Sequence, residues 1–119
     1  CMVLERSSSE KLAALENIFG EEFSGKADHY RTGIYHLEVM PVGVSKAVGL
    51  QKLVDLLGLK MEQVIAIGDY DNDAALLSAA GLGIAVANAT DKVKNNADLV
   101  IGPCVEDAPA KLLSELFLQ

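Results

Sequence analysis

A regular alternation of helical segments and short apolar strands after Pro41 is the feature that most constrains the fold of this chain. Strands and helices that alternate in this way form right-handed crossovers and a parallel sheet covered by helices. We expect strands at residues 64–67, 84–86 and 99–101, and helices at residues 44–57 and 71–80, from Thr90 and from Asp107. The fold class is therefore predicted to be α/β, with parallel strands and flanking helices.

Three parallel strands form a smaller sheet than a doubly wound domain, which usually contains five or six strands. The first of these strands, residues 64–67, would then have a bare apolar edge, which natural proteins avoid. Because the chain opens with Cys1 rather than Met, and no signal peptide pattern follows, we expect further residues upstream. The prediction is an incomplete doubly wound sheet whose open edge pairs with a second copy in a homodimer or with a complementary N-terminal segment.

The first 40 residues have a different pattern, in which one helix is combined with antiparallel strands. A strand is expected at residues 2–5, followed by a helix that begins with a capping box of Ser7 and Glu10 and stops at Gly20. Two antiparallel strands with a turn near residues 32–33 should follow. This first segment is expected to end at Pro41.

The composition excludes several classes of protein. Half of the 119 residues are hydrophobic, which suits one domain with a substantial core. The formal net charge of -7 and the lack of a Lys/Arg cluster argue against nucleic-acid binding. Residues 74–88 lack charge but are too few to span a membrane, so no membrane segment is expected. Cys1 and Cys104 are too few for a disulfide framework, which favours a cytoplasmic location.

Three aspartates follow the first apolar strand in the stretch VIAIGDYDND, residues 64–73. Asp69 comes directly after the strand, where open α/β sheets bind ligands, and the next helix brings Asp73 back toward the same crevice. Two carboxylates there suit Mg²⁺, which prefers oxygen ligands and often uses one or two carboxylates plus a substrate phosphate. Asn72 lies at the helix N-terminus, where free backbone N–H groups favour a phosphate oxygen.

The residues alone leave two chemistries open for this cluster. Either Asp69 is a nucleophile with Asp71 as its acid/base partner, or Asp69 and Asp73 hold a divalent metal for a nucleophile elsewhere. An EF-hand is excluded because the chain lacks the Gly and Glu that its loop requires, whereas aspartates that only cap the helix are the structural alternative. Lys46 favours a functional site, because the start of its helix could bring an ammonium to a phosphoryl group in the crevice. Its own alternative is an ordinary surface lysine.

Two longer stretches carry a resemblance to a known family. LEVMPVGVSKAVGLQKLVDLLGL and VIAIGDYDNDAALLSAAGLGIAVANATDKVKNNADLVI are similar to the lysine motif and the acidic motif of the haloacid dehalogenase (HAD) superfamily, specifically its Cof-type sugar-phosphate phosphatases. By this resemblance, residues 1–40 correspond to the C-terminal part of the family's α/β cap domain. Residues 41–119 correspond to the C-terminal half of its Rossmann-like core.

The resemblance implies a Mg²⁺-dependent phosphatase that acts on phosphorylated small molecules of the sugar-phosphate type. It implies that Asp69 and Asp73 bind Mg²⁺, with Asp73 acting directly or through water. It also implies that Asn72 and Lys46 contact the phosphoryl group, with Lys46 as a catalytic residue. The family's nucleophile lies in an N-terminal DxDGT-like motif, and no DxD in this chain is followed by Gly-Thr. The chain alone is therefore expected to be inactive, and the competing hypothesis is a non-catalytic dimerisation or binding module derived from the HAD fold.

Overall fold

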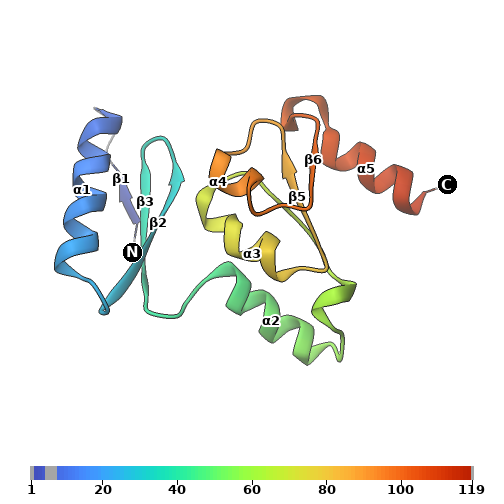
Figure 1. The fold of residues 1–119 in the computed structure, drawn as a ribbon, viewed down its shortest axis with the longest axis horizontal. Helices are drawn as coiled ribbons and strands as arrows, with labels where there is room; N and C mark the ends of the chain where they lie inside the picture. Colours follow the sequence, from blue (N-terminus) through green and yellow to red (C-terminus); the bar gives the residue numbers. More distant parts are fainter. Residues whose placement is uncertain (1, 5–7, 119) are drawn as a thin grey trace.

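The computed structural model describes residues 2–4 and 8–118, which form two sheets with their helices (Figure 1). The elements follow in the order β1 (Met2–Leu4), α1 (Ser9–Glu22), β2 (Ala27–Gly33), β3 (His36–Pro41), α2 (Lys46–Leu56), η1 (Met61–Gln63), β4 (Ile65–Gly68), η2 (Asp71–Asp73), α3 (Ala74–Ala79), β5 (Leu82–Val86), α4 (Asp91–Lys94), β6 (Leu99–Ile101), η3 (Cys104–Glu106) and α5 (Ala108–Phe117). The molecule is elongated, with principal extents of 50 × 34 × 21 Å, because the two sheets lie side by side along the long axis.

The first sheet is antiparallel, with strand order β1-β3-β2, and α1 covers one of its faces (Figure 1). Leu12 of α1 and Leu37 of β3 are fully buried between the helix and the sheet. Nε of Arg31 donates to Oε2 of Glu16 at 3.1 Å, which fixes the direction of β2 side chains relative to α1. Since side chains alternate along a strand, Tyr30 must point to the opposite face, away from α1.

Three local expectations for this segment need correction or lie outside the described residues. The helix begins after Ser8, whose Oγ accepts from the N–H of Lys11, and the proposed cap Ser7 lies outside the described residues. The helix does not stop at Gly20 but continues to Glu22, because the left-handed backbone that ends a helix occurs only at Gly25, with φ of 71°. The hairpin turns at residues 34–35 rather than 32–33, because β2 continues through Gly33, where the turn was expected.

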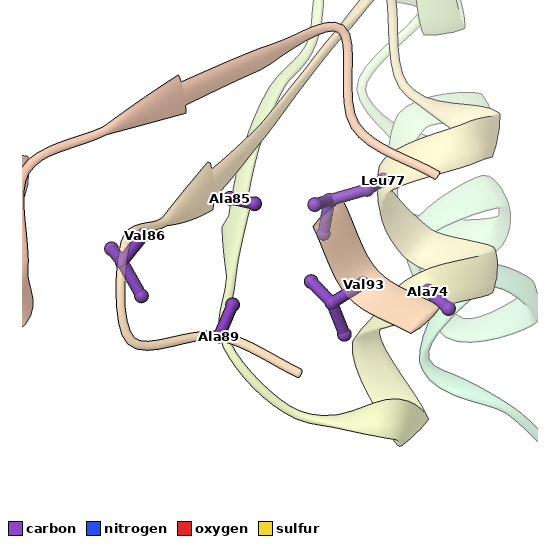
Figure 2. Packing of buried hydrophobic residues seen from close by; sticks show 6 residues of the cluster. All are labelled: Ala74, Leu77, Ala85, Val86, Ala89 and Val93. Atoms are coloured by element: carbon purple, nitrogen blue, oxygen red, sulfur yellow. The ribbon is translucent and has the colours of Figure 1, made fainter. Parts of the chain in front are cut away.

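The second sheet is parallel, with strand order β4-β5-β6, which confirms the predicted α/β class. Helices α3 and α4 pack against it around a core of small and branched apolar side chains (Figure 2). The core residues shown there are Ala74, Leu77, Ala85, Val86, Ala89 and Val93. Among the described strands, β4 pairs with β5 alone, so its other edge has no partner within this part of the chain.

The connection between the sheets is short and is held by a side chain. Gly43 has φ of 76°, a left-handed conformation that glycine adopts without strain, and its N–H donates to Oδ2 of Asp28 at 2.8 Å. Ser45 then caps α2 by accepting from the N–H of Val48, and Gly58 ends that helix with φ of 65°. This arrangement sets Lys46 in the first turn of α2, beside the 3₁₀ turn η2, and η2 in turn contacts strand β2.

No helix among the described residues is both long and apolar enough to cross a membrane.

Candidate functional site

The candidate site lies where β4 ends and the chain turns back through η2. A Cβ atom added at Gly68 would lie 2.5 Å from Cβ of Asp73 and 2.7 Å from Cδ1 of Leu77. Such a contact is far inside the normal separation of two carbon atoms. Glycine at the last position of the strand therefore allows the loop to fold back tightly over the strand end.

Asp73 is the centre of the hydrogen-bond network in this loop. It is the one buried polar or charged residue among those described, with 5% of its surface exposed. Its Oδ2 accepts from the backbone N–H groups of Asp69 at 3.1 Å and Tyr70 at 3.3 Å. Its Oδ1 accepts from Nζ of Lys46 at 2.5 Å. One carboxylate thus joins the strand end, the loop and the start of α2.

The protonation of Asp73 follows from these contacts. Burial alone would raise the pKa of Asp73, but hydrogen bonds from Lys46 and from the N–H groups of Asp69 and Tyr70 lower it below its ordinary value. The side chain of Lys46 is 50% exposed, whereas that of Asp73 is 7% exposed. Lys46 therefore has an ionised partner on one side and an open side from which an anionic ligand can approach.

Asp69 lines an open cavity of about 340 Å³ together with Lys46, Asp73 and Cys104. It is exposed, and no described residue donates a hydrogen bond to its carboxylate. No group of three or more His, Cys, Asp or Glu side chains within the described ranges forms a complete metal site. The donor set still fits Mg²⁺, because this ion often takes only one or two protein carboxylates and completes its coordination with waters and a substrate phosphate.

Thr90 holds the loop from the other side, and the sequence analysis named it as the start of a helix but not as a residue of the site. Its Oγ1 donates to Oδ1 of Asp71 at 2.7 Å, and its backbone N–H donates to the carbonyl of Asp69 at 3.0 Å. The same Oγ1 accepts from the N–H of Val93 and so caps α4. The sequence could indicate that Thr90 caps a helix, because threonine is a common N-cap residue. Its contact with Asp71 depends on the tertiary fold and could not be predicted.

Asn72 and Lys46 also line a second cavity of about 230 Å³, which extends toward the first sheet. The structure thus brings Lys46, Asp69 and Asp73 together at the first cavity. Asn72 lines the second cavity, together with Lys46. The far wall of the second cavity includes Tyr30, Glu38 and Met40, which sequence reasoning also missed. The alternation of side chains along β2 and β3 would have identified them once the register was known.

Comparisons with known proteins identify the family of this chain. A family model described as haloacid dehalogenase-like hydrolase matches residues 1–113. The 5-amino-6-(5-phospho-D-ribitylamino)uracil phosphatase YitU of Bacillus subtilis (strain 168) is 37% identical over 117 residues, covering 97% of this chain and 43% of that protein. A phosphoglycolate phosphatase of Methanopyrus kandleri is 45% identical over 102 residues, covering 82% of this chain and 43% of that protein.

Solved structures show the same likeness. A haloacid dehalogenase-like hydrolase from B. subtilis matches with a TM-score of 0.84 and 28% identity, over 98% of this chain and 40% of that chain. The chain spans less than half the length of each of these three proteins. Because the family model covers nearly all of its residues, the chain belongs to the haloacid dehalogenase-like hydrolases.

Proposed function

We propose that this chain supplies the lysine and metal half of the active site of a phosphomonoester hydrolase. The observation that carries the proposal is the 2.5 Å contact between Nζ of Lys46 and Oδ1 of Asp73, at the edge of the cavity that Asp69 lines. A half-exposed ammonium held by a buried carboxylate is suited to bind a phosphoryl group from its open side. The phosphatase names of the relatives support this choice of substrate chemistry.

In the proposed reaction, each residue of this chain has a part that its position supports. Lys46 neutralises charge on the phosphoryl oxygens, and Asn72 donates a hydrogen bond from its amide on the side of the second cavity. Asp73 fixes Lys46 in place, and Asp69 offers an exposed carboxylate. A Mg²⁺ ion bound by Asp69 and, directly or through water, by Asp73 would supply electrostatic stabilisation of the phosphoryl transfer.

The nucleophile of the proposed reaction is an aspartate that these 119 residues do not contain. We assign residues 1–40 to the C-terminal part of a cap domain and residues 41–119 to the C-terminal half of a HAD-like core. An aspartate from a complementary N-terminal segment would attack phosphorus, the alcohol would leave, and water would then hydrolyse the aspartyl-phosphate. The unpaired edge of β4 is where such a segment could add a strand.

Hydrolysis of p-nitrophenyl phosphate in the presence of Mg²⁺ by this chain tests the proposal, with Asp69→Asn as the matched variant. The expected result is no turnover by either protein. Turnover that the variant loses would mean that Asp69 itself is a nucleophile, and the assignment of Asp69 to the metal would be wrong. Binding is tested separately by titrating the folded chain with Mg²⁺ and inorganic phosphate and following its NMR spectrum. The backbone amide signals of Lys46 and Asn72 are expected to shift.

A second candidate function is favoured by the same open edge. Ile65 of β4 is 37% exposed, and an apolar edge strand is a template for pairing with another chain. We propose that two copies pair through β4 when no complementary segment is present. A dimer by light scattering at micromolar concentration is the expected result, and a monomer would overturn this candidate.

A cytoplasmic location stays a prediction.

A further inference from the structure

The second cavity, of about 230 Å³, lies between the first sheet and the Lys46 end of α2. One wall carries Lys46 and Asn72, the two residues assigned above to the phosphoryl group. The opposite wall carries Tyr30, Glu38 and Met40 from β2 and β3. A phosphate ester bound at Lys46 would therefore extend the rest of its molecule toward these three side chains.

The antiparallel register explains why these side chains share one wall. Tyr30 lies directly opposite Glu38, in the same row across the two strands. Arg31 bonds Glu16 of α1, so the neighbouring Tyr30 points to the face that α1 does not cover. That face is turned toward the second sheet, and β2 contacts η2 there. The wall is thus set by the fold rather than by the conformation of one side chain.

The charge of this wall is negative. The structure shows no ion pair between Glu38 and a described residue. A second carboxylate, that of Asp28, lies on the same face of β2 as Tyr30, where Asp28 is the strand partner of Met40. A carboxylate without a cationic partner accepts hydrogen bonds from hydroxyl or amino groups and repels a second carboxylate. Tyr30 and Met40 add apolar surface on either side of it.

We propose that Glu38 selects substrates by the charge of the group that the phosphate is attached to. The phosphate binds at Lys46 and Asn72, and a neutral or cationic group that bears hydroxyl or amino hydrogens binds against Glu38 and Tyr30. Esters whose other end carries a carboxylate are rejected. This inference rests on the proposed function, because it takes the phosphate position from that proposal.

Two ligands of matched size test the proposal. Glycerol 3-phosphate and 3-phosphoglycerate share the same carbon skeleton and phosphate, and they differ by a hydroxymethyl group in place of a carboxylate. NMR chemical-shift changes of the backbone amides of Lys46 and Asn72, measured with Mg²⁺ present, report the binding of each ligand and of inorganic phosphate to this chain. We expect glycerol 3-phosphate to bind about tenfold more tightly than 3-phosphoglycerate, a difference of ~1.4 kcal/mol.

Two variants separate the role of Glu38 from that of net charge. Glu38→Gln removes the charge and keeps a hydrogen-bond acceptor, so it should bring the two affinities within about twofold by strengthening binding of 3-phosphoglycerate. Glu21→Gln removes the same charge from an exposed position on α1 and should leave the preference unchanged.

Each remaining outcome contradicts one of the two proposals. Equal affinities in the unmodified chain would overturn the selection by Glu38 while leaving the phosphate site intact. Equal effects of Glu38→Gln and Glu21→Gln would show that net charge, not the cavity wall, sets the preference. No shift at Lys46 or Asn72 with any ligand, including inorganic phosphate, would overturn the proposed function and the inference with it.

Discussion

Nζ of Lys46 lies 2.5 Å from Oδ1 of Asp73, although the two residues are 27 positions apart in the sequence. Lys46 comes from the first turn of α2, and Asp73 ends the 3₁₀ turn after β4. Their contact joins the helix to the loop that carries Asp69, so the position of the ammonium and the shape of the loop depend on the same bond. The packing of α2 and the geometry of the site are therefore linked by one contact.

Lys46→Met should destabilise the chain by about 1–3 kcal/mol, because it leaves the buried carboxylate of Asp73 without its cationic donor. The half-exposed position of Lys46 keeps the effect below that of a fully buried pair. Urea unfolding followed by circular dichroism measures the change. Lys52→Met on the exposed part of the same helix should stay within about 0.5 kcal/mol of the unmodified chain. Equal losses in the two variants would contradict a special role for the Lys46–Asp73 pair.

Asp69→Asn should weaken Mg²⁺ binding about tenfold while the free energy of unfolding changes by less than about 0.5 kcal/mol. The carboxylate is exposed and accepts no hydrogen bond from a described residue, so its loss would remove the proposed metal ligand without removing a structural contact. Calorimetric titration with MgCl₂ gives the affinity. Glu62→Gln, an exposed charge outside the cavity that Asp69 lines, is the control and should bind Mg²⁺ as the unmodified chain does.

Thr90→Val should cost about 1–2 kcal/mol of stability, because the hydroxyl both caps α4 and donates to Asp71. The loop that carries Asp69 would also be held less firmly, so Mg²⁺ affinity should fall several-fold although Thr90 is not a proposed ligand. Thr90→Ser keeps the hydroxyl and should preserve both properties. If the valine and serine variants bind Mg²⁺ equally well, the hydroxyl has no part in shaping the site.

The strand-helix alternation after Pro41 was enough to predict the parallel sheet, because each apolar run is short and is followed by a helical pattern. Helix α2 ends within one residue of the predicted position 57, and Gly58, which follows with a positive φ, is a local signal for that end. Gly20 is also a glycine, but it lies within α1. Only the backbone conformation, which is left-handed at Gly25, shows which of the two glycines follows the end of the helix. The α/β class, which was predicted from periodicity, was confirmed, whereas the helix stop at Gly20 and the turn at residues 32–33, which needed a particular backbone conformation, were wrong.

The candidate site was predicted in part, for a physical reason. Asp69, Asp73 and Lys46 follow from motifs that are contiguous in sequence, and the structure brings them together at one cavity. Thr90 meets Asp71 through a hydrogen bond and Glu38 lies opposite Tyr30 through the strand register, and only the folded chain defines these two contacts. Long-range contacts of this kind have no signature in a single sequence.

Gly68→Ala should destabilise the chain by about 2–3 kcal/mol, because the new methyl group would overlap Cβ of Asp73 and Cδ1 of Leu77. Gly49 in the middle of α2 is the matched position, since a Cβ atom there has no neighbour within 4 Å. Gly49→Ala should stabilise the chain by about 0.5–1 kcal/mol through its higher helix propensity. Thermal unfolding of the two variants measures both changes. Opposite signs would show that glycine at the strand end is required by the return of Asp73, whereas a neutral Gly68→Ala would mean that the loop can move away without loss.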